Sequence, residues 1–133
     1  MPLDDLGRTL LLIGVLACVA LPAAATDRIR AGQWVGTTTM PGRTIPTSTC
    51  MSQSDADAMN GDAESVRAYL EKVIPPTICK LTNIKVNGGQ VVYTSACGGA
   101  AENVVTTSYH GGSFEGTTTN GTKTEGKWVG ACK

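Results

Sequence analysis

The chain has 133 residues, and its 11 basic side chains are balanced by 11 acidic ones. This length fits one domain and leaves little room for a second. Because nucleic-acid binding requires a basic face, the charge balance excludes nucleic acid as an expected partner.

Residues 1–25 have the pattern of an export signal. Arg8 precedes the apolar run TLLLIGVLACVAL, and Pro22 and the string AAAT follow it. The small residues suit a signal peptidase, and the run is too short and wrongly flanked for a resident transmembrane helix. We predict cleavage after Ala25, which leaves residues 26–133 as a single disulfide-bonded, β-rich domain that is periplasmic or secreted.

The same segment contains an alternative signal, because the string VLAC ending at Cys18 resembles the lipobox of bacterial lipoproteins. Acylation of Cys18 would anchor the domain to a membrane. The apolar run continues past Cys18 and ends in a better peptidase site, so lipidation stays the alternative to a soluble exported protein. No apolar run of membrane-spanning length follows Leu21, and we expect no transmembrane span in the mature chain.

The mature chain begins with a predicted hairpin. The strings QWVGTTTM (33–40) and RTIPTSTC (43–50) read as strands because they are rich in Thr, Val and Ile. Pro41 and Gly42 between them suit the two central positions of a tight turn.

The next segment, residues 52–76, loses β character and predicts a helix. Asp62 is suited to cap the N-terminus of this helix, and Pro75 and Pro76 end it. The apolar residues between these signals recur at helical spacing and form one stripe, which comprises Val66, Tyr69, Leu70 and Val73. We expect this helix to lie on the sheet.

Residues 79–97 predict a second hairpin. A two-residue turn at Gly88 and Gly89 matches the preference of tight β-hairpins for glycine. This turn places Val86 opposite Val91, and it gives the apolar side chains near the turn a common face.

The first strand of this hairpin requires one extra residue if Cys79 and Leu81 are to share that apolar face. We therefore predict a β-bulge near Thr82 and Asn83. Beyond the bulge, Cys79 lies opposite Cys97, and directly opposed strand residues are close enough for a disulfide.

Three further strands are predicted in residues 103–110, 113–120 and 122–132, separated by GG and NG turn signals. The expected fold is mainly β (α+β), an antiparallel meander of about seven strands, curved or barrel-like, with one or two short helices. The strings GQWVG and GKWVG recur in the first and last strands. If these strands met, the sheet would close with Trp34 and Trp128 on a common wall, although chance repetition is the preferred interpretation.

Four of the five cysteines remain once the signal segment is removed, and an even number in an exported chain predicts two disulfides. Cys79 pairs with Cys97 by register, and Cys50 pairs with Cys132 by elimination. Zinc is a poor alternative, because the gaps are long, no C-x-x-C string occurs and His110 is the only histidine. We expect no metal and no cofactor. The mature chain has only 17 Leu, Ile, Val and Phe residues, so its small core favours such covalent links.

No catalytic motif is present, and we expect no enzyme. His110 has no nucleophile motif such as G-x-S-x-G beside it, and the carboxylates Glu115 and Glu125 are expected to be solvated. The repeated TTT strings offer hydroxyl rows for sugar or ice, but threonine also simply suits solvent-facing strands. A small hydrolase that uses His110 remains the alternative.

These features together resemble a family. An export signal, a GxW first strand, ICK…NGG…SAC, YHGGSFEG and a closing GKWVGACK are similar to the bacterial domain of unknown function 3617 family, over about residues 33–133. The resemblance implies a periplasmic protein and brings no activity, ligand or catalytic residue. We therefore expect a non-enzymatic binding or interaction module of the cell envelope, whose partner is an unknown small ligand or envelope protein.

Overall fold

A computed structural model describes residues 27–133 of the chain. The predicted cleavage after Ala25 and the alternative lipidation of Cys18 lie outside the described residues.

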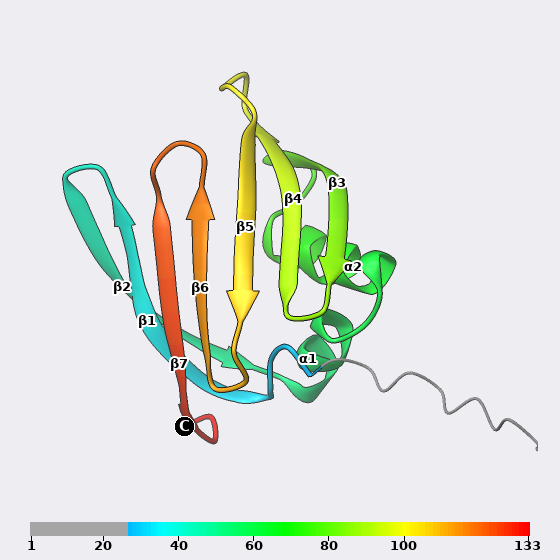
Figure 1. Ribbon diagram of the computed structural model, residues 1–133, viewed down its shortest axis with the longest axis vertical. Coiled ribbons are helices and arrows are strands. Elements are labelled where there is room, and N and C mark those ends of the chain that lie inside the picture. The colour runs from blue at the N-terminus through cyan, green and yellow to red at the C-terminus, as the bar shows by residue number, and fades with distance from the viewer. Residues whose placement is uncertain (1–26) are drawn as a thin grey trace, which may run out of the picture.

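The fold is one antiparallel sheet with two short helices on one face, as predicted (Figure 1). Its seven strands lie in the order β2-β1-β7-β6-β5-β4-β3. In chain order, the strands are β1 (Gly32–Met40), β2 (Arg43–Met51), β3 (Cys79–Asn87), β4 (Gln90–Cys97), β5 (Asn103–Tyr109), β6 (Ser113–Thr118) and β7 (Lys123–Gly130). From β3 to β7 the strands form a simple meander, which agrees with the turn signals of the sequence.

The sheet is open, and it does not close into the barrel that the repeated strings left as an alternative. β1 and β7 do pair, with Trp34 opposite Trp128, and the two similar strings therefore mark neighbouring strands. Pairing of β1 with β7 cannot close the sheet, because the hairpin partner β2 occupies the other edge of β1. The outer edges are β2 and β3. Pro46 interrupts the row of edge N–H groups on β2, and a bulge interrupts β3, which discourages pairing with other chains.

The hairpin of β3 and β4 has the predicted turn and the predicted bulge. Val86 lies opposite Val91, and the register shifts between Thr82 and Lys85. Asn83, in the bulge, is the only non-glycine residue with positive φ (53°) in the described part of the chain. The shift leaves the cysteines at the far end of the hairpin directly opposed.

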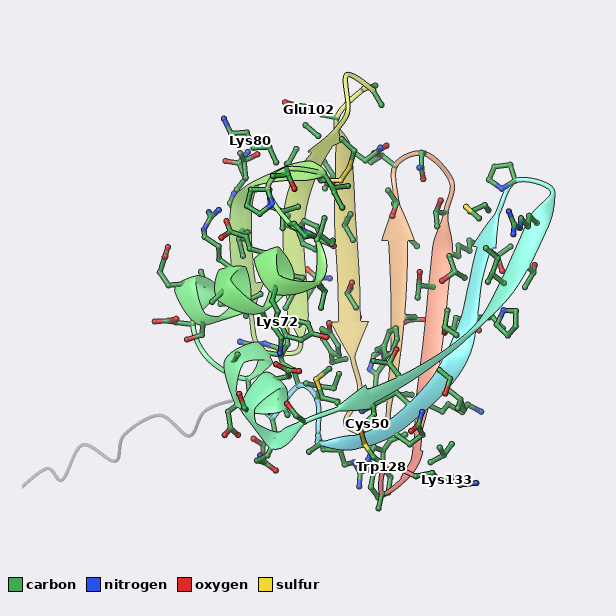
Figure 2. All side chains as sticks on the ribbon, turned by 180° about the vertical axis from the view of Figure 1, so that it is seen from behind. Cys50, Lys72, Lys80, Glu102, Trp128 and Lys133 are labelled. Atoms are coloured by element: carbon green, nitrogen blue, oxygen red, sulfur yellow. A yellow bond between two sulfur atoms is a disulfide. The ribbon has the colours of Figure 1, made fainter. Side chains whose placement is uncertain are left out.

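Both disulfides of the structure have the pairing that the sequence predicts. Cys79 is bonded to Cys97, with Cα atoms 4.1 Å apart, and Cys50 is bonded to Cys132, with Cα atoms 5.5 Å apart. The second bond joins the end of β2 to the segment after β7, across the intervening β1, where Gln33 pairs with both neighbours. Figure 2 shows Cys50 at this lower end of the sheet. The bond therefore holds three adjacent strands together.

Two helices connect β2 to β3, namely α1 (Gln53–Met59) and α2 (Ala63–Val73). Asp62 caps α2 as predicted, since its side chain accepts a hydrogen bond from the Ser65 N–H at 2.9 Å. Val66 and Leu70 of the predicted stripe are buried. Val73 is not, with 52% of its surface exposed, because it is the last residue of the helix and the chain turns away there.

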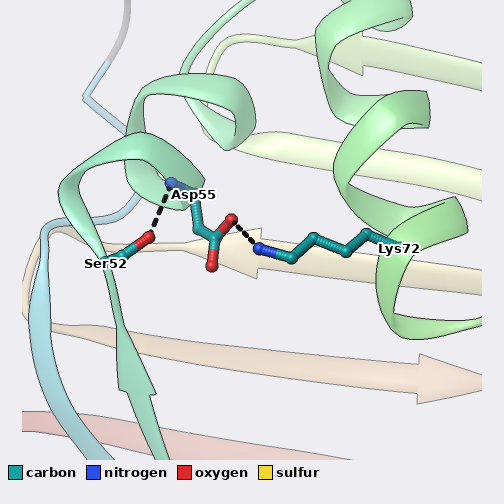
Figure 3. Close-up of polar contacts among 3 residues, drawn as sticks. All are labelled: Ser52, Asp55 and Lys72. Atoms are coloured by element: carbon teal, nitrogen blue, oxygen red, sulfur yellow. Dashed lines mark hydrogen bonds and ion pairs between the residues drawn. The ribbon is translucent and has the colours of Figure 1, made fainter.

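The helices are also linked to each other. Lys72 of α2 donates to the Asp55 carboxylate of α1 at 2.8 Å, and the Asp55 N–H donates to the hydroxyl of Ser52, the N-cap of α1 (Figure 3). The hydrogen bond from Lys72 lowers the pKa of Asp55. The ion pair fixes α1 relative to α2.

We call the sheet face that carries the helices the inner face, and the opposite face the outer face. Figure 2 shows that the helices cover β3 and β4 on the inner face, whereas the part of this face over β6 and β7 is not covered by a helix. The main core lies between helices and sheet, and it includes Ala56, Val66, Leu70, Leu81 and Val91. Trp34 extends the core toward the uncovered part.

Candidate functional site

A cavity of about 160 Å³ lies on the inner face, at the boundary between the helix-covered and the open part of the sheet. Strands, helices and the segment before β1 all contribute to its wall. The lining residues are Ile29, Trp34, Val35, Thr47, Thr49, Met51, Met59, Tyr69, Tyr109, Phe114 and Gly126.

Strand register creates the sheet side of this cavity. One row of inner-face residues runs from β2 across to β5 through five directly paired positions, which are Thr47, Gly36, Gly126, Phe114 and Tyr109. The two glycines permit close approach: a Cβ at Gly36 would meet the Glu125 carbonyl of β7, and a Cβ at Gly126 would meet the Phe114 ring.

Gly126 is required by the ring of Phe114. A Cβ atom at Gly126 would collide with Cε1 and Cζ of that ring, so only glycine permits the ring to lie over β7. In this position the Phe114 ring centroid is 5.7 Å from that of Trp34 and 5.9 Å from that of Tyr109. These distances are typical of favourable aromatic pairs. Three aromatic rings therefore form a continuous wall.

The other side of the cavity is formed by α1, α2 and the segment before β1. Met59 ends α1, and Tyr69 projects from α2. Ile29 is held by Asn60, whose side-chain amide donates to the Ile29 carbonyl at 2.7 Å and accepts from the Ile29 N–H at 2.9 Å. This two-way bond ties the first described residues to the end of α1.

No lining residue of the cavity carries a charge at neutral pH. Burial raises the pKa of the Tyr109 phenol far above its usual range, and burial also raises the pKa of Tyr69. Both phenols therefore stay protonated and can donate hydrogen bonds. The wall is mostly apolar, with the hydroxyls of two tyrosines and two threonines as its polar groups.

This arrangement suits binding of a small apolar group. An apolar cavity of about 150 Å³ in another protein holds benzene, so a ring or a short aliphatic chain is the expected size. Aromatic walls with a few polar groups are typical of small-molecule sites.

His110 lies elsewhere, in a shallow depression of about 640 Å³ whose polar side chains belong to the outer face, among them Ser113, Glu115, Glu125 and Lys127. His110 Nε2 is 3.3 Å from Glu115 Oε1, and Glu115 lies directly opposite Glu125 on β7. Both partners of the His110 contact are exposed. In residues 27–133, the Ser113 hydroxyl makes no hydrogen bond to the imidazole, so a nucleophile and its base are not assembled there.

The structure also places the cysteines and the TTT strings that the sequence analysis considered. All four cysteines of the described chain are in disulfides, and this part of the chain contains no group of His, Cys, Asp and Glu that could hold a metal. The TTT strings alternate between the two faces, so Thr38 and Thr118 lie on the inner face and their neighbours on the outer one. A single hydroxyl surface does not form from either string.

Sequence reasoning did not identify the residues of the cavity. Alternation along each strand does place Trp34, Phe114 and Tyr109 on inward positions, which was the available signal. The missing information was the pairing of β1 with β7 and the position of the helices and of Ile29 over this face.

Comparison with known proteins assigns the family. The family model described as "Protein of unknown function (DUF3617)" matches residues 29–132, and the chain belongs to this family. No curated protein and no solved structure matches the chain significantly. Among residues 27–133, no helix has the length and apolar character needed to cross a membrane.

Proposed function

We propose that this DUF3617 protein is a non-enzymatic binding module of the cell envelope, which holds the apolar part of a small molecule in the inner-face cavity. The main observation that supports this proposal is the aromatic wall of Trp34, Phe114 and Tyr109 beside a cavity of about 160 Å³.

The envelope location is part of the proposal. The segment before residue 26 has the pattern of an export signal. Two disulfides in a chain of this size support an oxidising compartment, because thiols stay reduced in the cytosol. The mature protein is periplasmic or secreted in this proposal, and attachment through a lipidated Cys18 is its alternative.

Native mass spectrometry of protein purified from the envelope fraction tests the binding function. We expect a small molecule to copurify with the wild-type protein. Thr47→Phe should fill the cavity and abolish copurification, whereas Ser48→Phe, on the outer face of the same strand, should retain the ligand. If both variants fold and retain the ligand equally, the ligand binds outside the cavity. If no small molecule copurifies with the wild-type protein and added six-carbon compounds do not bind to it, the proposed function is contradicted.

A further inference from the structure

Arg28 is the only buried cationic side chain in the described part of the chain, with 6% of its surface exposed. Its Nε donates to the Gly88 carbonyl at 2.7 Å, and its Nη1 donates to the carbonyls of Met59 at 2.8 Å and Gly61 at 3.0 Å. Within residues 27–133, Nη2 has no hydrogen-bond partner and no carboxylate forms a salt bridge with the guanidinium. The positive charge is therefore fixed in place without a counter-ion.

This charge lies behind the wall of the inner-face cavity. Arg28 precedes Ile29, which lines the cavity, and it bonds to the backbone of Met59, which also lines it. The guanidinium is close enough to Tyr109 to oppose, in part, the burial that raises the pKa of that phenol. The backbone also connects the cation to Tyr109, because Arg28 binds the carbonyl of Gly88 and the Tyr109 N–H donates to the carbonyl of the next residue, Gly89, at 2.8 Å.

Two hydrogen-bond donors belong to the cavity wall, namely the phenols of Tyr69 and Tyr109. Among the described residues, no buried side-chain oxygen or nitrogen lacks a hydrogen-bond partner. The hydroxyls of Tyr69 and Tyr109 make no hydrogen bond to the described part of the protein, so they open onto accessible space. Tyr69 and Tyr109 line the cavity, and burial keeps both protonated. Protonated phenols with free O–H groups are good donors to an anion.

We infer that the cavity takes an apolar molecule with a carboxylate headgroup, oriented toward Tyr69 and Tyr109 in the field of Arg28. This inference rests on the proposed function. The apolar part occupies the space beside Trp34 and Phe114. The carboxylate accepts hydrogen bonds from the two phenols, and its charge balances the unpaired guanidinium, which already has a fixed position.

The same observations disfavour other headgroups. An ammonium group has no acceptor carboxylate in the lining and is repelled by Arg28. An alcohol can accept from the phenols, but a bond to a neutral oxygen is weaker than one to an anion. We therefore expect a ligand with a carboxylate headgroup to bind more tightly than a neutral or cationic ligand with the same apolar part.

Three probes with the same six-carbon chain test the inference, namely hexanoate, hexan-1-ol and hexylamine. Titration of the disulfide-bonded protein, followed by amide chemical shifts in NMR spectra, gives both the site and the dissociation constant. We expect hexanoate to bind about ten-fold more tightly than hexan-1-ol at pH 7, and hexylamine to bind more weakly than either. Shifts should concentrate around Trp34, Tyr109 and Met59.

A matched pair of variants tests the role of the phenol. Tyr109→Phe should weaken hexanoate binding about ten-fold, whereas Tyr93→Phe, the same substitution outside the cavity lining, should leave it unchanged. In addition, ¹³C-carboxyl titration of bound hexanoate should give a pKa below that of free hexanoate, because Arg28 and the phenols stabilise the anion.

The outcomes separate this inference from the proposed function. Equal or tighter binding of hexan-1-ol, or a raised pKa of bound hexanoate, would overturn the carboxylate inference and leave an apolar binding site. If all three probes leave the spectra of the folded protein unchanged, the cavity does not bind ligands, and the proposed function fails with the inference.

Discussion

Trp34 and Trp128 lie opposite each other on β1 and β7, and their indole N–H groups donate to the carbonyls of consecutive residues, Arg30 and Ala31, both at 2.9 Å. These two hydrogen bonds attach residues 30–31, just before β1, to β1 and β7. The Arg30 guanidinium also lies 4.2 Å from the centroid of the Trp128 ring, a cation–π contact. The two tryptophans differ in one respect, since only Trp34 lines the inner-face cavity.

This difference predicts the effect of Trp128→Phe. The variant loses the hydrogen bond to Ala31, and the free energy of unfolding should fall by about 1–3 kcal/mol. Hexanoate affinity should be unchanged, because Trp128 lies outside the cavity lining. Urea denaturation and the NMR titration measure the two quantities, and a large loss of affinity in the folded variant would contradict this assignment.

The two disulfides should differ in their contribution to stability. The Cys50–Cys132 bond spans 82 residues and the Cys79–Cys97 bond spans 18. In the chain-entropy model the longer closure restricts the unfolded chain more, by roughly 1 kcal/mol. Replacing Cys50 and Cys132 by Ala should therefore lower the denaturation midpoint further than the same change at Cys79 and Cys97.

Peptide mapping without reduction checks the connectivity itself. Protein from the oxidised envelope fraction should yield peptides that link Cys79 to Cys97 and Cys50 to Cys132. A peptide that links Cys50 to Cys79, or free thiols throughout, would contradict the pairing.

Asn83 should tolerate glycine but not a β-branched residue. Its φ of 53° lies in the left-handed region, where a side chain with a branched Cβ is strained. Asn83→Val should lower the free energy of unfolding by about 1–2 kcal/mol, while Asn83→Gly should change it little. Thr82→Val, one residue earlier on the same strand, is the control in thermal denaturation, and equal effects of the two valine substitutions would argue against backbone strain.

His110 should be dispensable for folding and for ligand binding. Its imidazole makes a polar contact with Glu115, and both side chains are exposed on the surface. We expect His110→Ala to retain its melting temperature and its hexanoate affinity. A screen against ester and glycoside substrates checks the hydrolase alternative, and activity that is lost in His110→Ala at an unchanged melting temperature would support an enzyme.

Local features of the fold follow from the sequence because they depend on residues near each other in the chain. The Gly88-Gly89 turn and the alternation of its strands predict the register that brings Cys79 opposite Cys97, including the bulge. Asp62 similarly marks the start of α2 through a cap that needs only its own neighbours. Val73 fits the helical period but is exposed, because it is the last residue of α2, where the chain turns away.

The family, the predominance of β-structure and the cysteine pairs could thus be predicted from the sequence alone. The tertiary structure decided that the sheet stays open, since the place of β2 outside β1 results from contacts between distant segments. It also decided the cavity. Phe114 can lie over Gly126 only once β6 and β7 are paired. Arg28 becomes a buried cation near Tyr109 only when the segment before β1 packs against α1 and the β3–β4 turn. Alternation tells which side chains share a face of one strand, but the neighbours across strands and helices depend on the packing of the whole chain.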